Sequence, residues 1–168
     1  MSDAIVRIRA ELGALLPRLR RFARALAKNV DDADDVVQIA LERALERADQ
    51  WNRNSKLESW MFGIIRNAWI DEVRGRARRG AIFAPEVAGL DVGVEVIERE
   101  IEATSIQEAM ARLPEEQREV VALVLVEGLT YQQTADLLEV PIGTVTSRLA
   151  RGREALQKTL DAADGRRS

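Results

Sequence analysis

The stretch that decides the fold runs from Thr130 to Leu156 and reads TYQQTADLLEVPIGTVTSRLARGREAL. Thr130 predicts the start of a short helix over residues 131–138, because a threonine hydroxyl in front of a helix can accept a free backbone N–H. The segment EVPIG then predicts a turn, and a second helix is expected from about Gly143 to Leu160. Two short helices joined by a tight turn are typical of a helix-turn-helix.

The second helix of this stretch has two different sides when its residues are placed at about 100° intervals. The side expected to pack is apolar and consists of Val145, Leu149 and Leu156. The opposite side is polar and consists of Thr144, Ser147, Arg148 and Arg151. Short hydroxyls let a helix approach base edges, and arginines behind them reach bases or phosphates. The pattern predicts a DNA-recognition helix, and the alternative is a bundle helix with a solvated arginine face.

The composition limits the classes of protein that the chain can form. Its 168 residues are 32% charged and only 4% aromatic, which favours one or two small helical domains. The chain has no cysteine and no histidine, so it lacks thiolate metal ligands and the commonest general base. We therefore expect no metal, no cofactor and no enzyme activity. The acidic run at 31–35 is expected to cap a helix rather than to bind a metal.

Apolar residues at helical spacing predict helices over about 5–28, 33–48 and 57–79, and two more helices split at Pro114. Pro17 lies inside the first helix, so we expect a kink or two shorter helices there. Residues 81–108 carry seven acids against one base, which predicts an acidic linker that becomes partly helical from Val94.

The expected fold is all-α, with two small helical domains at residues 1–80 and 106–168 joined by a flexible linker at 81–105. The linker has little to bury, so the domain arrangement is expected to be mobile in the free chain. No run approaches the roughly 20 apolar residues of a membrane helix, and the first residues lack a signal-peptide pattern. We therefore expect a cytoplasmic protein without membrane insertion.

The helix expected over 57–79 has an unusual polar face. That face combines an aromatic ring, an amide, an acid and two arginines: Trp60, Asn67, Asp71, Arg74 and Arg78. A large aromatic at the head of a basic face suits base stacking or strand parting. The preceding loop offers hydrogen-bonding groups to an exposed base, namely Asn52, Asn54, Ser55 and Lys56. The alternative is that Trp60 and Trp69 are core residues and the arginines are merely solvated.

Three segments resemble, in the same order, the extracytoplasmic-function (ECF) sigma factors of bacteria. They are DDADDVVQIALERA (31–44), SWMFGIIRNAWIDEVRGRAR (59–78) and LPEEQREVVALVLVEGLTYQQTADLLEVPIGTVTSRLARGREAL (113–156), and the resemblance covers about residues 17–156. It implies an RNA polymerase specificity subunit that directs the core enzyme to promoters and opens DNA in a stress or signal response. Residues 1–80 would be region 2 and residues 106–168 region 4. The implied partners are core RNA polymerase, promoter DNA and an anti-sigma factor.

The resemblance also implies roles for three sets of residues. Core polymerase would bind Asp34, Asp35, Val36, Gln38 and Leu41. The −10 promoter element would be read as a single strand by Asn52, Ser55, Lys56, Trp60, Arg66, Asn67, Asp71, Arg74 and Arg78. The −35 element would be read as duplex by Thr144, Ser147, Arg148, Arg151 and Arg153, with Tyr131 and Gln132 over its backbone.

The helix-turn-helix departs from the family's pattern at three places. Gln133-Thr134 stands where Glu-Ile is common, Glu139 where the turn often has glycine, and Thr146 where a basic residue is frequent. A turn that needs a positive φ would strain Glu139.

Two other functions fit parts of the pattern. A sigma-like decoy that captures an anti-sigma factor would need no DNA contacts, yet Trp60, Asn67 and Arg151 are retained. A free-standing repressor would need to dimerise to bind two half-sites, and the sequence shows no dimerisation element.

Overall fold

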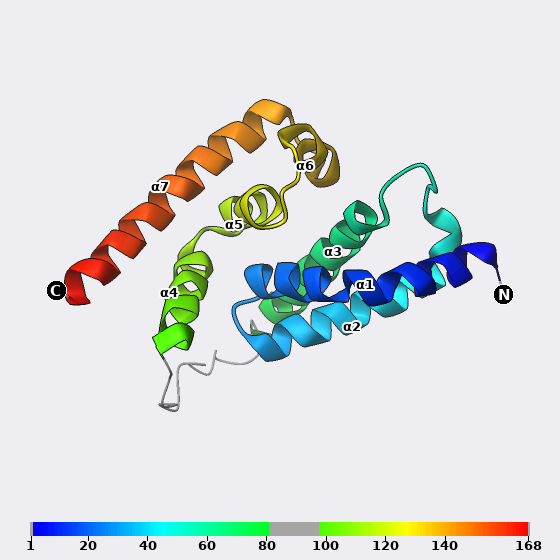
Figure 1. The fold of residues 1–168 in the computed structure, drawn as a ribbon, viewed down its shortest axis with the longest axis horizontal. Helices are drawn as coiled ribbons and strands as arrows, with labels where there is room; N and C mark the ends of the chain where they lie inside the picture. Colours follow the sequence, from blue (N-terminus) through cyan, green and yellow to red (C-terminus); the bar gives the residue numbers. More distant parts are fainter. Residues whose placement is uncertain (1, 81–97, 168) are drawn as a thin grey trace.

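The computed structural model describes residues 2–80 and 98–167, and these residues form helices without any strand. The first unit consists of α1 (Asp3–Leu26), α2 (Val30–Glu46), the short 3₁₀ turn η1 (Ala48–Gln50) and α3 (Leu57–Gly80). The second unit consists of α4 (Glu98–Arg112), α5 (Glu115–Val121), the π-helical turn η2 (Ala122–Val126), α6 (Tyr131–Leu138) and α7 (Ile142–Arg167). Figure 1 shows the two units next to each other, and α5 and η2 contact α1. The predicted all-α class is confirmed.

Most helix bounds agree with the sequence predictions, and the chain differs from them at Pro17. We expected a kink or two shorter helices at Pro17; α1 runs through this residue as one helix, so the second alternative is wrong and the kink stays a prediction. Pro17 removes one backbone donor, but the buried side chains of Ile8 and Leu19 fasten both parts of α1 to one core. α4 begins at Glu98, which agrees with the expectation that the acidic linker becomes partly helical from Val94, and residues 81–97 lie outside the described residues.

The first unit is a three-helix core that holds α3 in place. Phe22 of α1 and Phe62 of α3 are fully buried, with ring centroids 4.9 Å apart. α2 approaches this pair through a row of buried alanines, Ala33, Ala40 and Ala44. Small side chains let helices lie close together at native packing density. The polar face of α3 is therefore presented from a rigid base.

The second unit depends on a close crossing of α5 and α7 at Gly152. A Cβ atom added at Gly152 would lie 2.7 Å from Cγ2 of Val121, which is shorter than any normal contact. Val121 is itself 2% exposed and has no room to move outward. Only glycine fits at this crossing, and it fixes α7 on the rest of the unit.

Gly152→Ala is therefore expected to destabilise the protein although alanine is the better helix former. Overpacking costs about 1–3 kcal/mol, and the gain in helix propensity offsets at most about 1 kcal/mol. Urea denaturation should show a lower midpoint. Gly13→Ala in α1 is the matched control, because nothing lies within 4 Å of a Cβ added there. Equal effects at the two sites would contradict the close crossing.

Arg118 of α5 joins the two units from a buried position. It is 4% exposed, and its guanidinium donates to the backbone carbonyls of Met110 (3.0 Å), Ala111 (3.3 Å) and Leu113 (2.8 Å). It also donates to the carbonyl of Leu26, the last residue of α1, at 3.1 Å. These acceptors include the unpaired carbonyls at the ends of α1 and α4, where a cation also meets the negative dipole end.

This docking of the two units was not predicted from the sequence. The docking groups are side chains in helices, whereas the prediction of mobility rested on what the linker can bury. Domain mobility in the free chain stays a prediction.

Candidate nucleic-acid interface

The helix-turn-helix forms as predicted, and the two unusual residues of its first helix have structural roles. The Thr130 hydroxyl accepts the Gln133 N–H at 3.0 Å, and the Gln133 side chain accepts the Thr130 N–H at 2.9 Å. This reciprocal capping box satisfies two donors at the start of α6. Thr134 is fully buried and donates its hydroxyl proton to the Thr130 carbonyl at 2.9 Å.

The turn after α6 places Glu139 in the left-handed region, with φ 56° and ψ 46°. This is the conformation for which glycine is normally used, and a residue with a Cβ is strained there by about 1–2 kcal/mol. The Val140 N–H donates to the Ala135 carbonyl at 3.1 Å and closes the end of α6. The expected positive φ at Glu139 is thus confirmed.

The recognition helix α7 has the two predicted sides. Val145 and Leu149 are 0% and 2% exposed in the core, and Leu156 packs against it from a half-buried position. On the other side Ser147, Arg151 and Arg153 are exposed and Thr144 is half-buried. Arg148 is half-buried and forms an ion pair of 3.6 Å with Glu116 of α5. Tyr131 and Gln132 of α6 are exposed as well.

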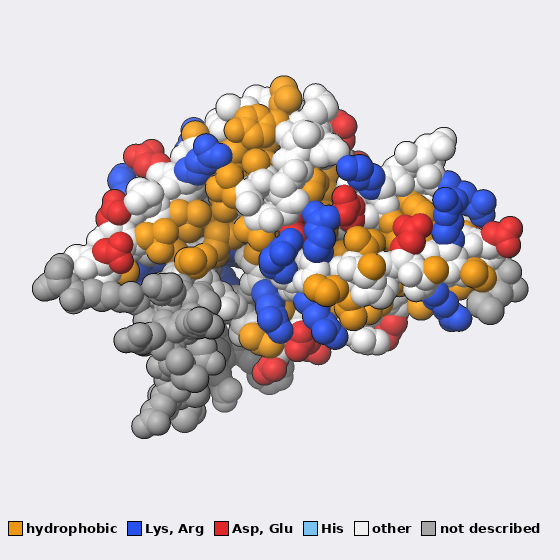
Figure 2. Space-filling model, in the orientation of Figure 1, with side chains coloured by type: hydrophobic (Ala, Val, Ile, Leu, Met, Phe, Trp, Pro, Cys, Tyr) orange, Lys and Arg blue, Asp and Glu red, His pale blue; other side chains and the backbone are white. Residues whose placement is uncertain are grey.

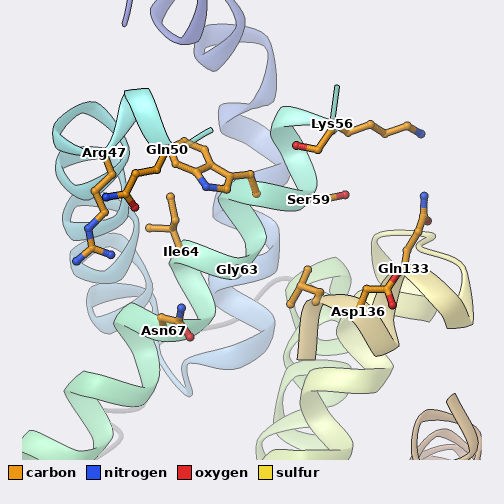
Figure 3. A pocket seen from close by; sticks show the side chains of 12 residues that line it. Arg47, Gln50, Lys56, Ser59, Gly63, Ile64, Asn67, Gln133 and Asp136 are labelled. Carbon is orange, nitrogen blue, oxygen red and sulfur yellow. The ribbon is translucent and has the colours of Figure 1, made fainter. Parts of the chain in front are cut away.

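A cleft of about 580 Å³ lies between the polar face of α3 and helix α6. One wall includes four of the predicted −10 residues, Ser55, Lys56, Trp60 and Asn67. The opposite wall is formed by Gln133, Asp136 and Leu137 of α6. Figure 3 shows Gln133 and Asp136 across the cleft from Ser59 and Gly63. Sequence reasoning missed Arg47, Gln50, Ser59 and Gly63, which also line this cleft.

The tryptophans divide between the cleft and the core. Trp60 is half-buried at the cleft and stacks on Trp51, with ring centroids 6.4 Å apart and planes 30° apart. Trp51 is 7% exposed and supports it from below. Trp69 is 4% exposed, so for this residue the core alternative is confirmed. Trp60 lines the cleft, and an aromatic ring in such a position is a stacking surface for a base.

The other residues assigned to the −10 element lie outside the cleft lining. Asn52 shapes the loop: its side chain accepts the Asn54 N–H at 3.0 Å, and its carbonyl accepts the Ser55 hydroxyl at 2.6 Å. Asp71 pairs with Arg43 of α2 at 2.9 Å. Further along α3, Arg74 and Arg78 are exposed.

Arg66 points to the second unit instead of the cleft. Its Nε donates to Oε1 of Glu119 on α5 at 3.1 Å. Glu119 is 3% exposed, and burial raises the pKa of its carboxyl while Arg66 opposes that rise. In this arrangement Arg66 neutralises a buried carboxylate, and it could meet DNA only after leaving Glu119.

The residues assigned to polymerase lie on α2 with unequal exposure. Asp34, Asp35 and Gln38 are exposed, and Leu41 is half-buried. Val36 is 1% exposed within the core, which corrects the expectation that it offers surface to a partner. Val36 and Val37 face the core between the exposed Asp35 and Gln38, because successive helical residues turn by about 100°.

α2 is tied to α3 by Asp32 and Arg76. Arg76 donates from Nη1 to Oδ2 of Asp32 at 2.8 Å and from Nη2 to Oδ1 at 2.5 Å. The hydrogen bonds from Arg76 hold the pKa of the Asp32 carboxyl below its ordinary value. The unfolded chain therefore binds a proton at Asp32 more readily than the folded chain does.

Folding lowers the pKa of the Asp32 carboxyl, so the ionised carboxylate stabilises the fold. This contribution is fully present above about pH 4 and is lost as the pH falls through the lowered pKa of the folded state. Asp32→Asn is expected to cost about 1 kcal/mol at pH 7, because the Arg76 side chain is 45% exposed and solvent screens the pair. The difference from wild type should shrink to nothing in acid. Urea titrations at several pH values test this, with Asp31→Asn as control. A difference independent of pH would contradict it.

Within residues 2–80 and 98–167, no three acidic, histidine or cysteine side chains are grouped closely enough to hold a metal ion. None of the helices in these same ranges has the length and apolar character needed to cross a bilayer.

The helix-turn-helix and the aromatic-edged cleft lie in the two parts of the chain that match sigma-type transcription initiation factors. Family models agree: "Sigma-70, region 4" matches residues 103–156, and "Sigma2 domain of PhyR" matches residues 12–66. The chain is 33% identical to the ECF sigma factor EcfG of Rhodopseudomonas palustris over 91% of this chain and 84% of the relative. It is also 33% identical to SigW of Bacillus subtilis, over 79% of this chain and 77% of the relative.

Among solved structures, the sigma factor RpoE in complex with the anti-sigma factor NepR, from Bartonella quintana, is similar. Its TM-score is 0.77 at 31% identity, and the match covers 92% of this chain and 97% of that one. The chain therefore belongs to the ECF RNA polymerase sigma factors.

Proposed function

We propose that the chain directs core RNA polymerase to a set of promoters by reading each promoter with two surfaces. Residues 1–80 form region 2, which binds polymerase and reads the −10 element. Residues 106–168 form region 4, which reads the −35 element, and residues 81–105 link them. The observation that carries this proposal is the pairing, on one chain, of a cleft edged by Trp60 with a recognition helix that exposes Arg151.

The division of work follows from the chemistry of the two surfaces. A single strand offers unstacked bases, which bind aromatic rings and short polar groups such as Trp60, Asn67 and Ser55. A duplex offers base edges only in its grooves, where a helix with exposed Ser147 and Arg151 fits. Arg74 and Arg78 supply charge for the phosphates along α3.

We also propose two protein partners, core RNA polymerase and an anti-sigma factor. Asp34, Asp35, Gln38 and Leu41 form the patch of α2 that we assign to core polymerase. Because the similar RpoE was solved with an anti-sigma factor, we assign a partner of that kind to this chain. We place its action in the cytoplasm, with RNA synthesis performed by polymerase and no catalysis by the chain itself.

The test is run-off transcription from a pool of genomic promoters, with core polymerase in the presence and absence of the chain. Chain-dependent start sites are expected, and Arg148→Ala plus Arg151→Ala should remove most of them. Lys158→Ala plus Arg166→Ala is the matched control, since it removes the same charge from the far end of α7. Polymerase binding without any new transcript would favour the decoy function instead.

A further inference from the structure

A second cavity, of about 640 Å³, lies where the loop between α1 and α2 and the side of α3 meet the turn between α4 and α5. It shares no lining residue with the cleft beside Trp60. Its volume falls within the roughly 300–1,000 Å³ of small-molecule sites in proteins. The lining carries four basic side chains against two acidic ones, so the second cavity favours an anionic ligand.

Three of these six charged side chains already have protein partners. Arg76 donates to both carboxylate oxygens of Asp32, and Arg118 donates to four backbone carbonyls. The other three form no ion pair within the described part of the chain: Lys28, Arg112 and Glu115. The second cavity therefore has two cations and one carboxylate that the protein itself does not use.

Two buried polar atoms at the second cavity also lack a hydrogen-bond partner among the described residues. Trp69 is 4% exposed, and its indole Nε1–H has no acceptor. The Oε1 atom of Glu115 is buried and has no donor. Such atoms are uncommon in folded proteins, because the hydrogen bonds that they lose to water on burial are not replaced. Both residues line the second cavity, so a molecule bound there can supply the missing partners.

The unused groups define the chemistry of that molecule. Lys28 and Arg112 are exposed cations, which suit a phosphate group. The Trp69 N–H requires an acceptor and the Glu115 carboxylate requires a donor. Every nucleobase carries a donor or acceptor of each kind on its edges. A phosphate joined to a nucleobase therefore meets all four requirements.

Apolar side chains in the same lining favour a nucleobase over a sugar alone. Val73, Leu113 and Pro114 line the second cavity beside the polar groups. Burial of the apolar surface of a planar ring against them is favourable. A sugar phosphate can form the hydrogen bonds, but it has little apolar surface to bury.

We propose that the second cavity binds a nucleoside monophosphate, with the phosphate held by Lys28 and Arg112 and the base edge bonded to Trp69 and Glu115. None of these four residues belongs to the sets assigned to DNA or to polymerase. The inference goes beyond promoter recognition and does not depend on the assignment of either DNA-reading surface.

The first measurement is isothermal titration calorimetry of the full chain. The probes are the four ribonucleoside 5′-monophosphates, ribose 5-phosphate and inorganic phosphate, all at one salt concentration. At least one nucleotide is expected to bind with a Kd below about 1 mM. It should bind about tenfold more tightly than ribose 5-phosphate, because only the nucleotide brings the base. The ratio of the ribose 5-phosphate Kd to the nucleotide Kd is the base factor.

Two variants remove the contacts assigned to the base. Trp69→Phe removes the N–H and keeps an aromatic ring, and Glu115→Gln keeps the side-chain shape without the carboxylate. Each is expected to lower the base factor about fivefold, as for loss of one hydrogen bond. The ratio is used because loss of the Glu115 charge tightens binding of every anion alike. If Trp69→Phe fails to fold by circular dichroism, the half-buried Glu115→Gln still tests the proposal.

A third variant removes the contacts assigned to the phosphate. Lys28→Ala plus Arg112→Ala is expected to weaken the nucleotide and ribose 5-phosphate together, by about tenfold, and to leave the base factor unchanged. Lys158→Ala plus Arg166→Ala is the matched control, because it removes the same charge from residues outside the lining. This control should bind both probes as the wild type does.

Nucleotides can also bind elsewhere on a basic surface. Figure 2 shows lysine and arginine side chains gathered over α1. The cleft also offers the Trp60 ring to any base. Trp60→Ala is therefore titrated in parallel, and it should keep the wild-type base factor because Trp60 does not line the second cavity.

Three outcomes would overturn the proposal. Loss of nucleotide binding in Trp60→Ala, with the base factor unchanged in Trp69→Phe and Glu115→Gln, would place the nucleotide in the cleft. Equal binding of nucleotides, ribose 5-phosphate and inorganic phosphate would mark a general anion site. No binding of any nucleotide at about 1 mM would leave water as the only occupant. Failure of the proposed function would appear in run-off transcription and would change none of these titrations.

Discussion

Replacing Arg118 by alanine is expected to lower the free energy of unfolding by about 3–5 kcal/mol, as for removal of one partner from a buried charged network. The guanidinium donates to four backbone carbonyls from two chain segments, residue 26 and residues 110–113, and alanine offers them no donor. Burial lowers the pKa of Arg118, opposed by Glu115 and Glu119, and an arginine stays charged under these conditions. Urea denaturation measures the loss.

Arg118→Lys is the informative companion variant. Lysine keeps the charge but carries its donors on one atom, so it cannot reach carbonyls that diverge as these do. We expect a loss between wild type and Arg118→Ala. If Arg118→Ala were as stable as wild type, the four carbonyls would have to find water, and the buried network would not be a stability determinant.

The largest functional effect is expected for Trp60→Ala. Loss of one aromatic–base stack costs about 1–3 kcal/mol, which corresponds to about 5- to 150-fold in transcription limited by DNA opening. The measurement is transcription from a promoter found in the genomic pool, as closed duplex and as a template already unpaired over the −10 element. The variant should fail mainly on the duplex.

Trp60→Phe serves as control, because phenylalanine keeps an aromatic face above Trp51 and should retain part of the activity. The unpaired template separates melting from binding: recovery there assigns Trp60 to strand opening. Full activity of Trp60→Ala on closed duplex would show that another group stacks on the opened base.

Local features were the ones that could be predicted from sequence. The helix-turn-helix follows from a cap, a proline turn and a two-sided helix, all within 27 consecutive residues. The start of α3 at Leu57 agrees as well, and Trp60 and Asn67 were placed together because they share one face of that helix. In each case the deciding interactions lie within a few residues of one another.

Features made by distant segments were missed for the same reason. Arg21 and Glu127 are 106 positions apart, and nothing in either neighbourhood predicts that they meet. Arg118 follows three polar residues and reads as a solvated charge until the ends of α1 and α4 are in place around it. The face of α2 was assigned as one patch, and only the packing shows that Val36 belongs to the core.

The π-helical turn η2 determines the direction in which Glu127 points. The Glu127 N–H donates to the Ala122 carbonyl at 2.9 Å, one residue further back than in an α-helix. Removing one residue from Ala122–Val126 would restore the ordinary helical repeat and turn Glu127 by about 100° around the axis. The capping box of α6 and the arginines of α7 would keep their sequence. Deletion of a single codon there would therefore separate Glu127 from Arg21 and leave the sequence of the proposed DNA-reading helix unchanged.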